Sequence, residues 1–179
     1  MKANIVYIAQ SLDGYIADKN GGLDWLHSVP NPNNDDGGFG DFMNRIDGLI
    51  MGRTTFETVC SFDIDWPYTK PVFVLSNTLK EIPNTHKKHA SLINGNLKTI
   101  IENLNNKGFN ELYIDGGTTI QSFLKEDLID EMIITTIPVL LGGGSSLFGD
   151  LAQPLNFELI QSKTVMGSIN QCYYKRKKQ

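Results

Sequence analysis

Two short stretches of the sequence join apolar residues, glycine and threonine in an order that suits anion binding. The first, "LIMGRTTFE" (49–57), is an apolar run that breaks at a glycine into an arginine, two threonines and helix-forming residues. The second, "YIDGGTTIQSFL" (113–124), also runs from apolar residues through glycines into threonines. A strand that stops at glycine can turn sharply into a helix. The first N–H groups of that helix, at the positive end of its dipole, then attract an anion.

Side chains in both stretches add to this chemistry. Arg53 offers a planar fork of donors suited to a phosphate group, and Thr54 or Thr55 can cap the helix or bind a phosphate oxygen. The adjacent Gly116 and Gly117 allow a ligand to approach the backbone closely. The alternative is purely structural, with a capped helix start in the first stretch and a tight strand-to-helix turn in the second. Neither stretch is a Rossmann signature, because no G-x-G-x-x-G follows the first apolar run.

The bulk composition indicates one globular domain spanning residues 1–179. Hydrophobic residues make up 40% of the 179 and charged residues 20%, which suffices for a sizeable core. No apolar stretch approaches the roughly 18 residues of a membrane span, and the N-terminus leads directly into strand-like sequence. The net charge of −4 gives no general attraction for nucleic acid. We therefore expect no membrane and no nucleic-acid partner.

Cysteine and histidine give no metal-site signal. Cys60 and Cys172 lie far apart without ligand spacing, which favours a reduced, cytoplasmic compartment. "HKKH" (86–89) places two histidines close together, but no third ligand is near, so a solvated turn is the better interpretation. We expect no metal.

Hydrophobic patterning predicts strands that alternate with helices. The predicted strands are 4–9, 48–51, 71–76, 90–94, 111–114 and 130–141, and the predicted helices are 39–46, 54–61, 97–108 and 118–127. Residues 157–178 alternate around Gly167, as expected of an antiparallel hairpin. The result is an α/β fold with a mainly parallel sheet of about eight strands. Ligands in such folds bind at the carboxyl ends of the strands, here near 9–16, 51–55 and 114–119.

Five motifs in order make the chain resemble the dihydrofolate reductase superfold, and within it the reductase domain of the riboflavin-synthesis deaminase/reductase. They are "IAQSLDGYIA" (8–17), "LIMGRTTFE" (49–57), "VLSN" (74–77), "YIDGG" (113–117) and "PVLLGGGSSLF" (138–148). The resemblance implies a three-layer fold with about four helices flanking the sheet. It also implies a homodimer. The zinc deaminase motifs H-x-E and P-C-x-x-C are missing, so the chain is not the complete bifunctional enzyme.

The activity that the resemblance implies is hydride transfer from NADPH to a pteridine- or pyrimidine-like heterocycle. Dihydrofolate and 5-amino-6-(5-phosphoribosylamino)uracil are the two examples from the superfold. An alternative from another class is a non-catalytic protein that binds or senses NADP(H). The cofactor motifs alone do not separate the two.

The resemblance also places an NADPH site residue by residue. Arg53 matches the arginine that helps to select the 2′-phosphate, and Gly116 and Gly117 match paired glycines that a cis peptide joins. The loop at 17–24 matches a mobile flap over the cofactor. The implied cofactor contacts are Ala9, Ile16, Gly52, Arg53, Thr54, Thr55, Leu75, Ser76, Asn77, Ile114, Gly116, Gly117, Thr118, Thr119 and Ile120.

The resemblance identifies fewer residues for the substrate site than for the cofactor site. Alignment with the buried carboxylate of folate reductases places Asp36 as the catalytic acid, although Asp35 or Asp41 could slide into register and a helix cap by Asp35 or Asp36 is the structural alternative. Trp25 and Thr135 match substrate contacts. Folate reductases also pair an arginine with the glutamate tail of the substrate. Between Arg53 and Ser76 only Lys70 is basic, so the sequence shows no convincing counterpart of that arginine.

Overall fold

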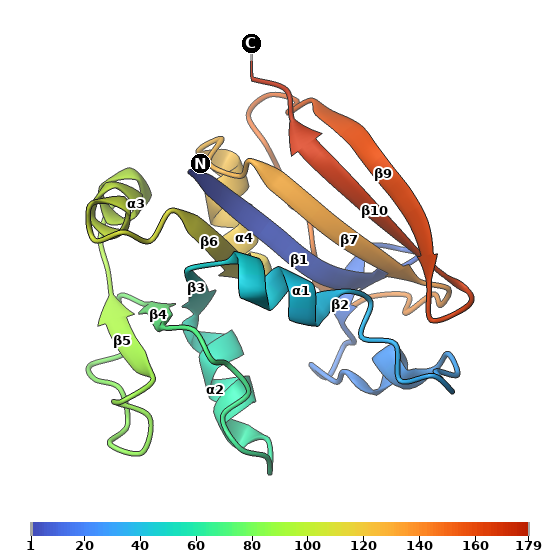
Figure 1. Ribbon diagram of the computed structural model, residues 1–179, viewed down its shortest axis with the longest axis horizontal. Coiled ribbons are helices and arrows are strands. Elements are labelled where there is room, and N and C mark those ends of the chain that lie inside the picture. The colour runs from blue at the N-terminus through green and yellow to red at the C-terminus, as the bar shows by residue number, and fades with distance from the viewer. Residues whose placement is uncertain (1, 179) are drawn as a thin grey trace.

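An eight-stranded β-sheet crosses the centre of the computed structural model, which describes residues 2–178 (Figure 1). Its strands are β1 (Ala3–Ser11), β3 (Gly48–Gly52), β4 (Val72–Leu75), β5 (Ala90–Ile93), β6 (Glu111–Asp115), β7 (Glu131–Ile137), β9 (Phe157–Val165) and β10 (Ile169–Arg176). They lie in the order β5-β4-β3-β6-β1-β7-β10-β9 across the sheet. Two further short strands, β2 (Tyr15–Ala17) and β8 (Ser145–Ser146), pair with each other beside it.

Strand direction divides the sheet into two parts. The six strands from β5 to β7 in the sheet order run parallel to their neighbours. β10 is antiparallel to both β7 and β9, so the C-terminal hairpin extends the sheet at one edge. The prediction of a mainly parallel eight-stranded sheet with a C-terminal hairpin is thereby confirmed.

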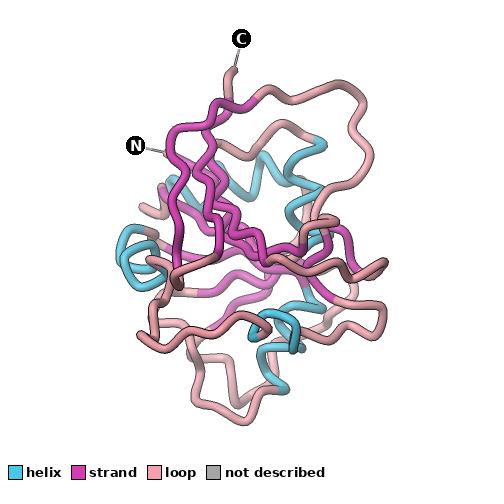
Figure 2. The backbone as a smooth tube through the Cα atoms, turned by 90° about the vertical axis from the view of Figure 1, so that its right-hand side faces the viewer, coloured by secondary structure: helices cyan, strands magenta, loops and turns pink. Residues whose placement is uncertain are grey.

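Helices cover both faces of the sheet, which makes three layers (Figure 2). They are α1 (Phe39–Arg45), α2 (Arg53–Ser61), α3 (Leu97–Asn106) and α4 (Gly117–Lys125), with one 3-10 turn, η1 (Asp24–His27). α1 and α2 pack in one hydrophobic cluster, and α3 and α4 pack in another. Figure 1 shows α1 in front of the strands and α4 behind them. The four predicted helices are confirmed, with ends that shift by one or two residues.

The sequence explains why α3 forms where it does. Asn96 precedes the helix, and its side-chain oxygen accepts a hydrogen bond from the N–H of Thr99, as an N-cap residue does. Leu97, Ile100 and Leu104 follow at spacings of three and four, which places them on one buried face against the sheet. Each fully buried aliphatic side chain contributes about 1.5–3 kcal/mol to stability.

The strand predicted over 130–141 is shorter in the structure. β7 ends at Ile137, because Pro138 has no N–H to continue the hydrogen-bond ladder. Beyond it, the N–H groups of Leu141 and Gly142 donate to the carboxylate of Asp13. This segment therefore ties down the turn after β1 and does not extend the sheet.

The helices of the described chain are short. Among residues 2–178, none is both long and apolar enough to cross a membrane.

Candidate active site

A cleft of about 970 Å³ opens at the carboxyl ends of β1, β3, β4 and β6. This is the edge at which ligands bind in open α/β sheets. Most residues implied for NADPH contribute to its lining, namely Ala9, Ile16, Gly52, Arg53, Thr54, Thr55, Leu75, Gly116, Gly117, Thr118 and Thr119.

The two glycine–threonine stretches form one site in the fold. β3 and β6 are parallel neighbours, so α2 and α4 begin side by side. Each helix start lies close to the other: a Cβ added to Gly52 would lie 2.7 Å from Oγ1 of Thr119, and one added to Gly116 would collide with Oγ1 of Thr55. Gly116 also has a φ of 91°, which L side chains rarely adopt. Glycine is therefore required at position 116, and at position 52 a larger residue would have to displace the Thr119 hydroxyl.

Both helix starts leave backbone donors at the cleft. The N-cap residues are Gly52 for α2 and Gly116 for α4, and no described side chain caps either helix. A capped start for α2 by Thr54 or Thr55 was the structural alternative, and it is wrong. The first-turn N–H groups remain available to an anion, beside hydroxyl groups that also line the cleft.

The peptide bond between Gly116 and Gly117 differs from the expectation based on the resemblance. A cis bond was expected there, but no cis peptide occurs within residues 2–178.

Arg53 lies at the rim of the cleft beside the end of β4. Its Nε donates to Oε1 of Glu57 at 2.7 Å, and Nη1 donates to Oγ1 of Thr78 at 3.3 Å. Both side chains of the Arg53–Glu57 pair are about half exposed. An exposed i,i+4 pair of this kind contributes only about 0.3–0.5 kcal/mol, so the guanidinium can exchange it for an anionic ligand at little cost.

Asp115 is the functional candidate that the sequence reasoning missed. It ends β6 and lines the cleft, and the N–H of Gly116 donates to its Oδ1 at 2.8 Å. Burial raises the pKa of Asp115 to about 6, and the bond from Gly116 offsets only part of that rise. Burial, with the charge of Asp115 nearby, also raises the pKa of Tyr68. The physical cause of the raised pKa of Asp115 is the desolvation of a carboxyl group that has no cation beside it.

A signal for Asp115 was present in the sequence. It stands in "YIDGG" at the end of a predicted strand, which is where an α/β sheet places its functional side chains. Tyr68, Val59 and Phe62 also line the cleft. They come from the end of α2 and the irregular segment after it, whose path the sequence pattern does not reveal.

Four residues implied for the cofactor do not line the cleft. Ile114 and Ile120 are fully buried in the cluster that packs α3 and α4 on the sheet. The hydroxyl oxygen of Ser76 accepts hydrogen bonds from the N–H groups of Thr78 and Leu79, which shapes the turn after β4. Asn77 is exposed in that turn.

Asp36 also lies outside the cleft lining, and its contacts are those of a helix cap. Its exposed carboxylate accepts hydrogen bonds from the N–H groups of Gly38 and Gly40 at the start of α1. The bonds from Gly40 and Gly38 hold the pKa of Asp36 below its ordinary value. A carboxyl group with a lowered pKa stays ionised near neutral pH and has no proton to donate.

The two implied substrate contacts are buried and are not part of the cleft lining. Trp25, in η1, packs with Ile137, Val165 and Ile169. Thr135, on β7, accepts a hydrogen bond at 2.9 Å from Nε2 of Gln171.

The segment at 17–24, which the resemblance matches to a mobile flap over the cofactor, adjoins the cleft. Gly21 and Leu23 contribute to the lining. Asp18 holds the turn, because its Oδ1 accepts hydrogen bonds from the N–H groups of Asn20 and Gly22. The segment follows β2, which pairs with β8 and so rests on the glycine-rich stretch near 142–146.

Comparison with known proteins agrees with this architecture. The RibD C-terminal domain family matches residues 4–169. The uncharacterized protein YwjB of Bacillus subtilis (strain 168) is 34% identical over 178 residues, which is 98% of each chain. A crystal structure from Shewanella sp. PV-4, of a protein assigned provisionally to riboflavin biosynthesis, is 64% identical, covers 98% of this chain and 99% of that chain, and has a TM-score of 0.96.

A more distant structure identifies the fold. Dihydrofolate reductase from Enterococcus faecalis covers 98% of this chain and 97% of its own, with a TM-score of 0.64. Its identity of 14% limits the likeness to the fold. The family match extends over most of the sequence and includes the strand ends that build the cleft. The chain therefore belongs to the RibD C-terminal domain family and has the dihydrofolate-reductase-like fold.

Proposed function

We propose that the protein is an NADPH-dependent reductase that transfers hydride to a pteridine- or pyrimidine-like heterocycle. The observation that carries this proposal is the pair of uncapped helix starts that meet at the carboxyl ends of β3 and β6, with Arg53 on the rim and Asp115 within the cleft. The family and the fold are of the reductase type, which supports the same conclusion.

The residues of the cleft fit an extended dinucleotide. Arg53 and Thr78, beside the end of β4, would hold the 2′-phosphate. The N–H groups and threonine hydroxyls at the starts of α2 and α4 would hold the pyrophosphate. Ala9 and Ile16 would lie against the nicotinamide. NADPH supplies the hydride, and the chain orients it and excludes water.

Asp115 is the group we assign to proton delivery. Its carboxyl lies at the cleft and has a pKa of about 6, so a useful fraction is protonated near neutral pH. Asp36, the donor expected from the resemblance, has a lowered pKa and lies outside the cleft lining. The proposal therefore places the proton on Asp115.

The test is NADPH oxidation followed at 340 nm with a panel of pteridines, pyrimidines and simpler imines as acceptors, together with calorimetry of cofactor binding. We expect NADPH to bind and at least one heterocycle to be reduced. Binding without reduction of any acceptor would instead support the non-catalytic NADP(H)-binding alternative. Failure of NADPH to bind would contradict both the reductase and the NADP(H)-binding proposal.

We also propose that the protein is a homodimer, as the resemblance implies, in a cytoplasmic compartment, as the two separated cysteines favour. β9 forms one edge of the sheet, and Leu159 and Ile160 on it are about half exposed, so this edge can accept a second copy. Light scattering should then give about twice the chain mass of 20.0 kDa. A mass of one chain across the micromolar range would reject the dimer.

A further inference from the structure

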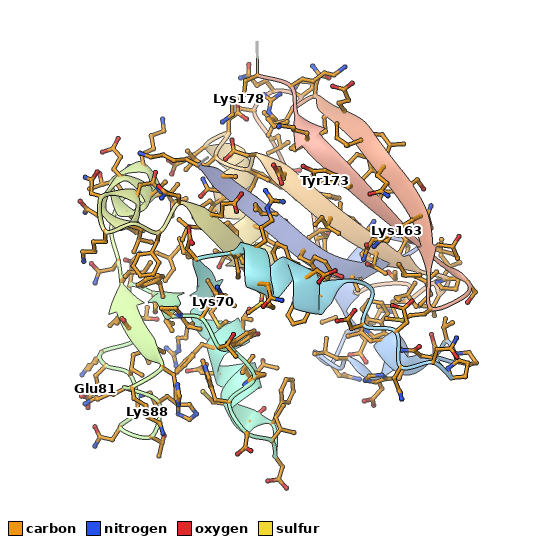
Figure 3. All side chains as sticks on the ribbon, viewed as in Figure 1. Lys70, Glu81, Lys88, Lys163, Tyr173 and Lys178 are labelled. Carbon is orange, nitrogen blue, oxygen red and sulfur yellow. The ribbon has the colours of Figure 1, made fainter. Side chains whose placement is uncertain are left out.

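A second cavity, of about 270 Å³, lies between α1 and the C-terminal strands of the sheet. Residues that face one another across neighbouring strands project on the same side of a sheet. Two such rows supply its floor: Gln171 faces Lys163, and Tyr173 faces Ile133, which in turn faces Tyr7. Figure 3 shows Lys163 and Tyr173 on the C-terminal hairpin. The pairing of four strands therefore determines which side chains meet in this cavity.

The opposite wall of the cavity is one face of α1. Gly38, Asp41, Phe42 and Arg45 line it, at spacings of three and four that place them together on a helix. Among residues 2–178, the cavity and the cleft have no lining residue in common. The cavity is therefore a separate candidate site.

Gln171 brings an unused acceptor to this cavity. The hydroxyl of Tyr7 donates its only proton to the carbonyl oxygen of Gly37 at 2.9 Å, so it must accept from Gln171. Nε2 of Gln171 accordingly donates to Tyr7 at 3.2 Å and to Oγ1 of Thr135 at 2.9 Å, which fixes the orientation of the amide. Its Oε1 accepts no hydrogen bond from the described residues, although Gln171 is only 4% exposed. A buried acceptor of this kind requires a donor.

Asp41 supplies a second free acceptor. Its carboxylate lines the cavity and forms no hydrogen bond or ion pair with any residue between 2 and 178. Arg45, one turn further along α1, does not neutralise it, because its guanidinium pairs with Glu111 and Glu131 at 2.9 and 2.8 Å. The negative charge of Asp41 is therefore available to a ligand.

Lys163, the other cation of the lining, also faces two carboxylates. A Cβ added to Gly38 would lie 3.5 Å from its Nζ, so the ammonium reaches the start of α1. Hydrogen bonds from backbone N–H groups hold the pKa of Asp35 and of Asp36 below the ordinary value, and the charge of Lys163 lowers both further. Each cation of the lining is thus offset by two carboxylates, and the charge of Asp41 is additional.

The tyrosines of the floor respond to this excess of negative charge. Burial raises the pKa of Tyr7, a hydrogen bond from the buried amide offsets part of the rise, and the charges of Asp36 and Asp35 add to it. Burial also raises the pKa of Tyr173, where Glu131 is the largest electrostatic cause. A negative charge nearby disfavours a second one and favours a cation.

The rest of the cavity surface is largely aromatic. The rings of Tyr7 and Phe42 stack with their centroids 4.8 Å apart, and Tyr173 lines the same space. The face of an aromatic ring attracts a cation. The volume of about 270 Å³ is small for a drug-sized ligand and suits a single ring or a short chain.

We propose that this cavity binds a small organic cation, such as a protonated amine, whose N–H groups donate to Oε1 of Gln171 and to the carboxylate of Asp41 while its apolar part packs on the rings of Tyr7 and Phe42. The hydrogen bond to the carboxylate is charge-assisted and gives the site its preference for a cation. This inference goes beyond the proposed reductase function and does not depend on it.

The test uses three probes of one shape and different charge, namely benzylammonium, benzyl alcohol and benzoate. NMR titration of the isotope-labelled full chain measures their dissociation constants and locates them. We expect benzylammonium to bind about tenfold or more tightly than benzyl alcohol, benzoate to bind most weakly, and the side-chain amide signals of Gln171 to shift. Equal affinities, a preference for benzoate, or no shift at Gln171 would overturn the inference. Shifts confined to Gly116 and Gly117 would place the probe in the cleft and would also overturn it.

Variants of the free carboxylate test the physical cause. Asp41→Asn should weaken benzylammonium by about tenfold and leave benzyl alcohol unchanged, which also shows that the cavity is intact. Asp41→Glu keeps the charge and should retain the preference for the cation. Glu102→Gln changes the net charge equally at an exposed position on α3 and should have no effect. The same loss in Glu102→Gln as in Asp41→Asn would show that overall charge causes the preference.

A variant of Lys163 distinguishes a cation site from an anion or zwitterion site. Lys163→Gln removes the opposing charge from the lining, so benzylammonium should bind more tightly. Lys98→Gln, on the exposed side of α3, is its charge control and should change nothing. Weaker binding of benzylammonium to Lys163→Gln, or a loss confined to benzoate, would overturn the assignment of a cation.

Discussion

Asp115→Asn is expected to lower kcat of the reductase by about 100-fold or more, with little change in the affinity for NADPH. Proton transfer from a positioned side chain typically contributes 10²–10⁴-fold to a rate, and asparagine cannot supply the proton. Its side-chain oxygen can still accept the hydrogen bond from Gly116, so the turn into α4 should be preserved. Steady-state kinetics and calorimetry with NADPH measure the two quantities separately.

The pH profile provides a second readout for the same variant. Because Asp115 has a pKa of about 6 and must be protonated to act, kcat of the wild-type protein should fall as the pH rises above about 6. In the Asp115→Asn variant, kcat should not show this decrease. A wild-type rate that stays constant between pH 5 and 8 would argue against Asp115 as the donor.

The same substitution should stabilise the fold. A folded-state pKa raised from 3.8 to about 6 means that the carboxyl favours the folded state fully below about pH 4, and that this contribution is lost as the pH rises through about 6. Removing the charge should therefore raise the free energy of unfolding at pH 7 by about 2–3 kcal/mol. The gain should disappear near pH 4. Urea denaturation at both pH values measures it.

Two matched variants complete this comparison. Asp36→Asn removes the carboxylate expected from the resemblance, and a loss of kcat there with activity retained in Asp115→Asn would move the donor to Asp36. Glu102→Gln removes an exposed carboxylate from α3 and should change neither kcat nor the pH profile.

Arg53→Ala is expected to weaken NADPH binding by about one to two decades while leaving NADH nearly unchanged. Loss of a charge-assisted contact to the 2′-phosphate costs about 1.5–3 kcal/mol, which corresponds to that factor in the dissociation constant. NADH has no 2′-phosphate, so its affinity should not change. The exposed pair with Glu57 contributes little, so the fold should not be affected.

Lys88→Ala is the matched control for Arg53→Ala. Lys88 is an exposed cation outside the cleft lining, so its removal changes the net charge equally and should leave both affinities as they are. If calorimetry shows that Arg53→Ala loses equal affinity for NADPH and for NADH, Arg53 does not bind the 2′-phosphate.

Much of the fold could be predicted because its signals are local. Apolar β-branched runs mark the parallel strands, and α3 carries its own cap and a regular apolar face. The prediction failed at the end of β7, where 138–141 is apolar enough for a strand. Pro138 ends the ladder, and a distant carboxylate, Asp13, binds the amides of Leu141 and Gly142. A pattern of neighbouring residues cannot show such a contact.

The glycine–threonine side of the cleft could also be predicted from the sequence, because its parts are glycines and threonines at strand ends. Whether such a start is capped by a side chain or left open depends on rotamers and neighbours that the sequence does not specify. The structure leaves α2 and α4 uncapped and brings them into contact through Gly52 and Gly116. That contact depends on the parallel pairing of β3 with β6, strands more than 50 residues apart in the sequence.

By itself, the sequence determined the order of strands and helices, the two glycine–threonine helix starts and the position of Arg53 at the first of them, since each depends on residues close together in the chain. Only the tertiary structure distinguished Asp115 from Asp36 as the proposed proton donor. Both are carboxylates beside glycines, and the difference is that backbone N–H groups stabilise the charge of one, while burial at the end of β6 destabilises the charge of the other. Desolvation is a property of the assembled cleft, so Asp115 could be proposed as the proton donor only from the tertiary structure.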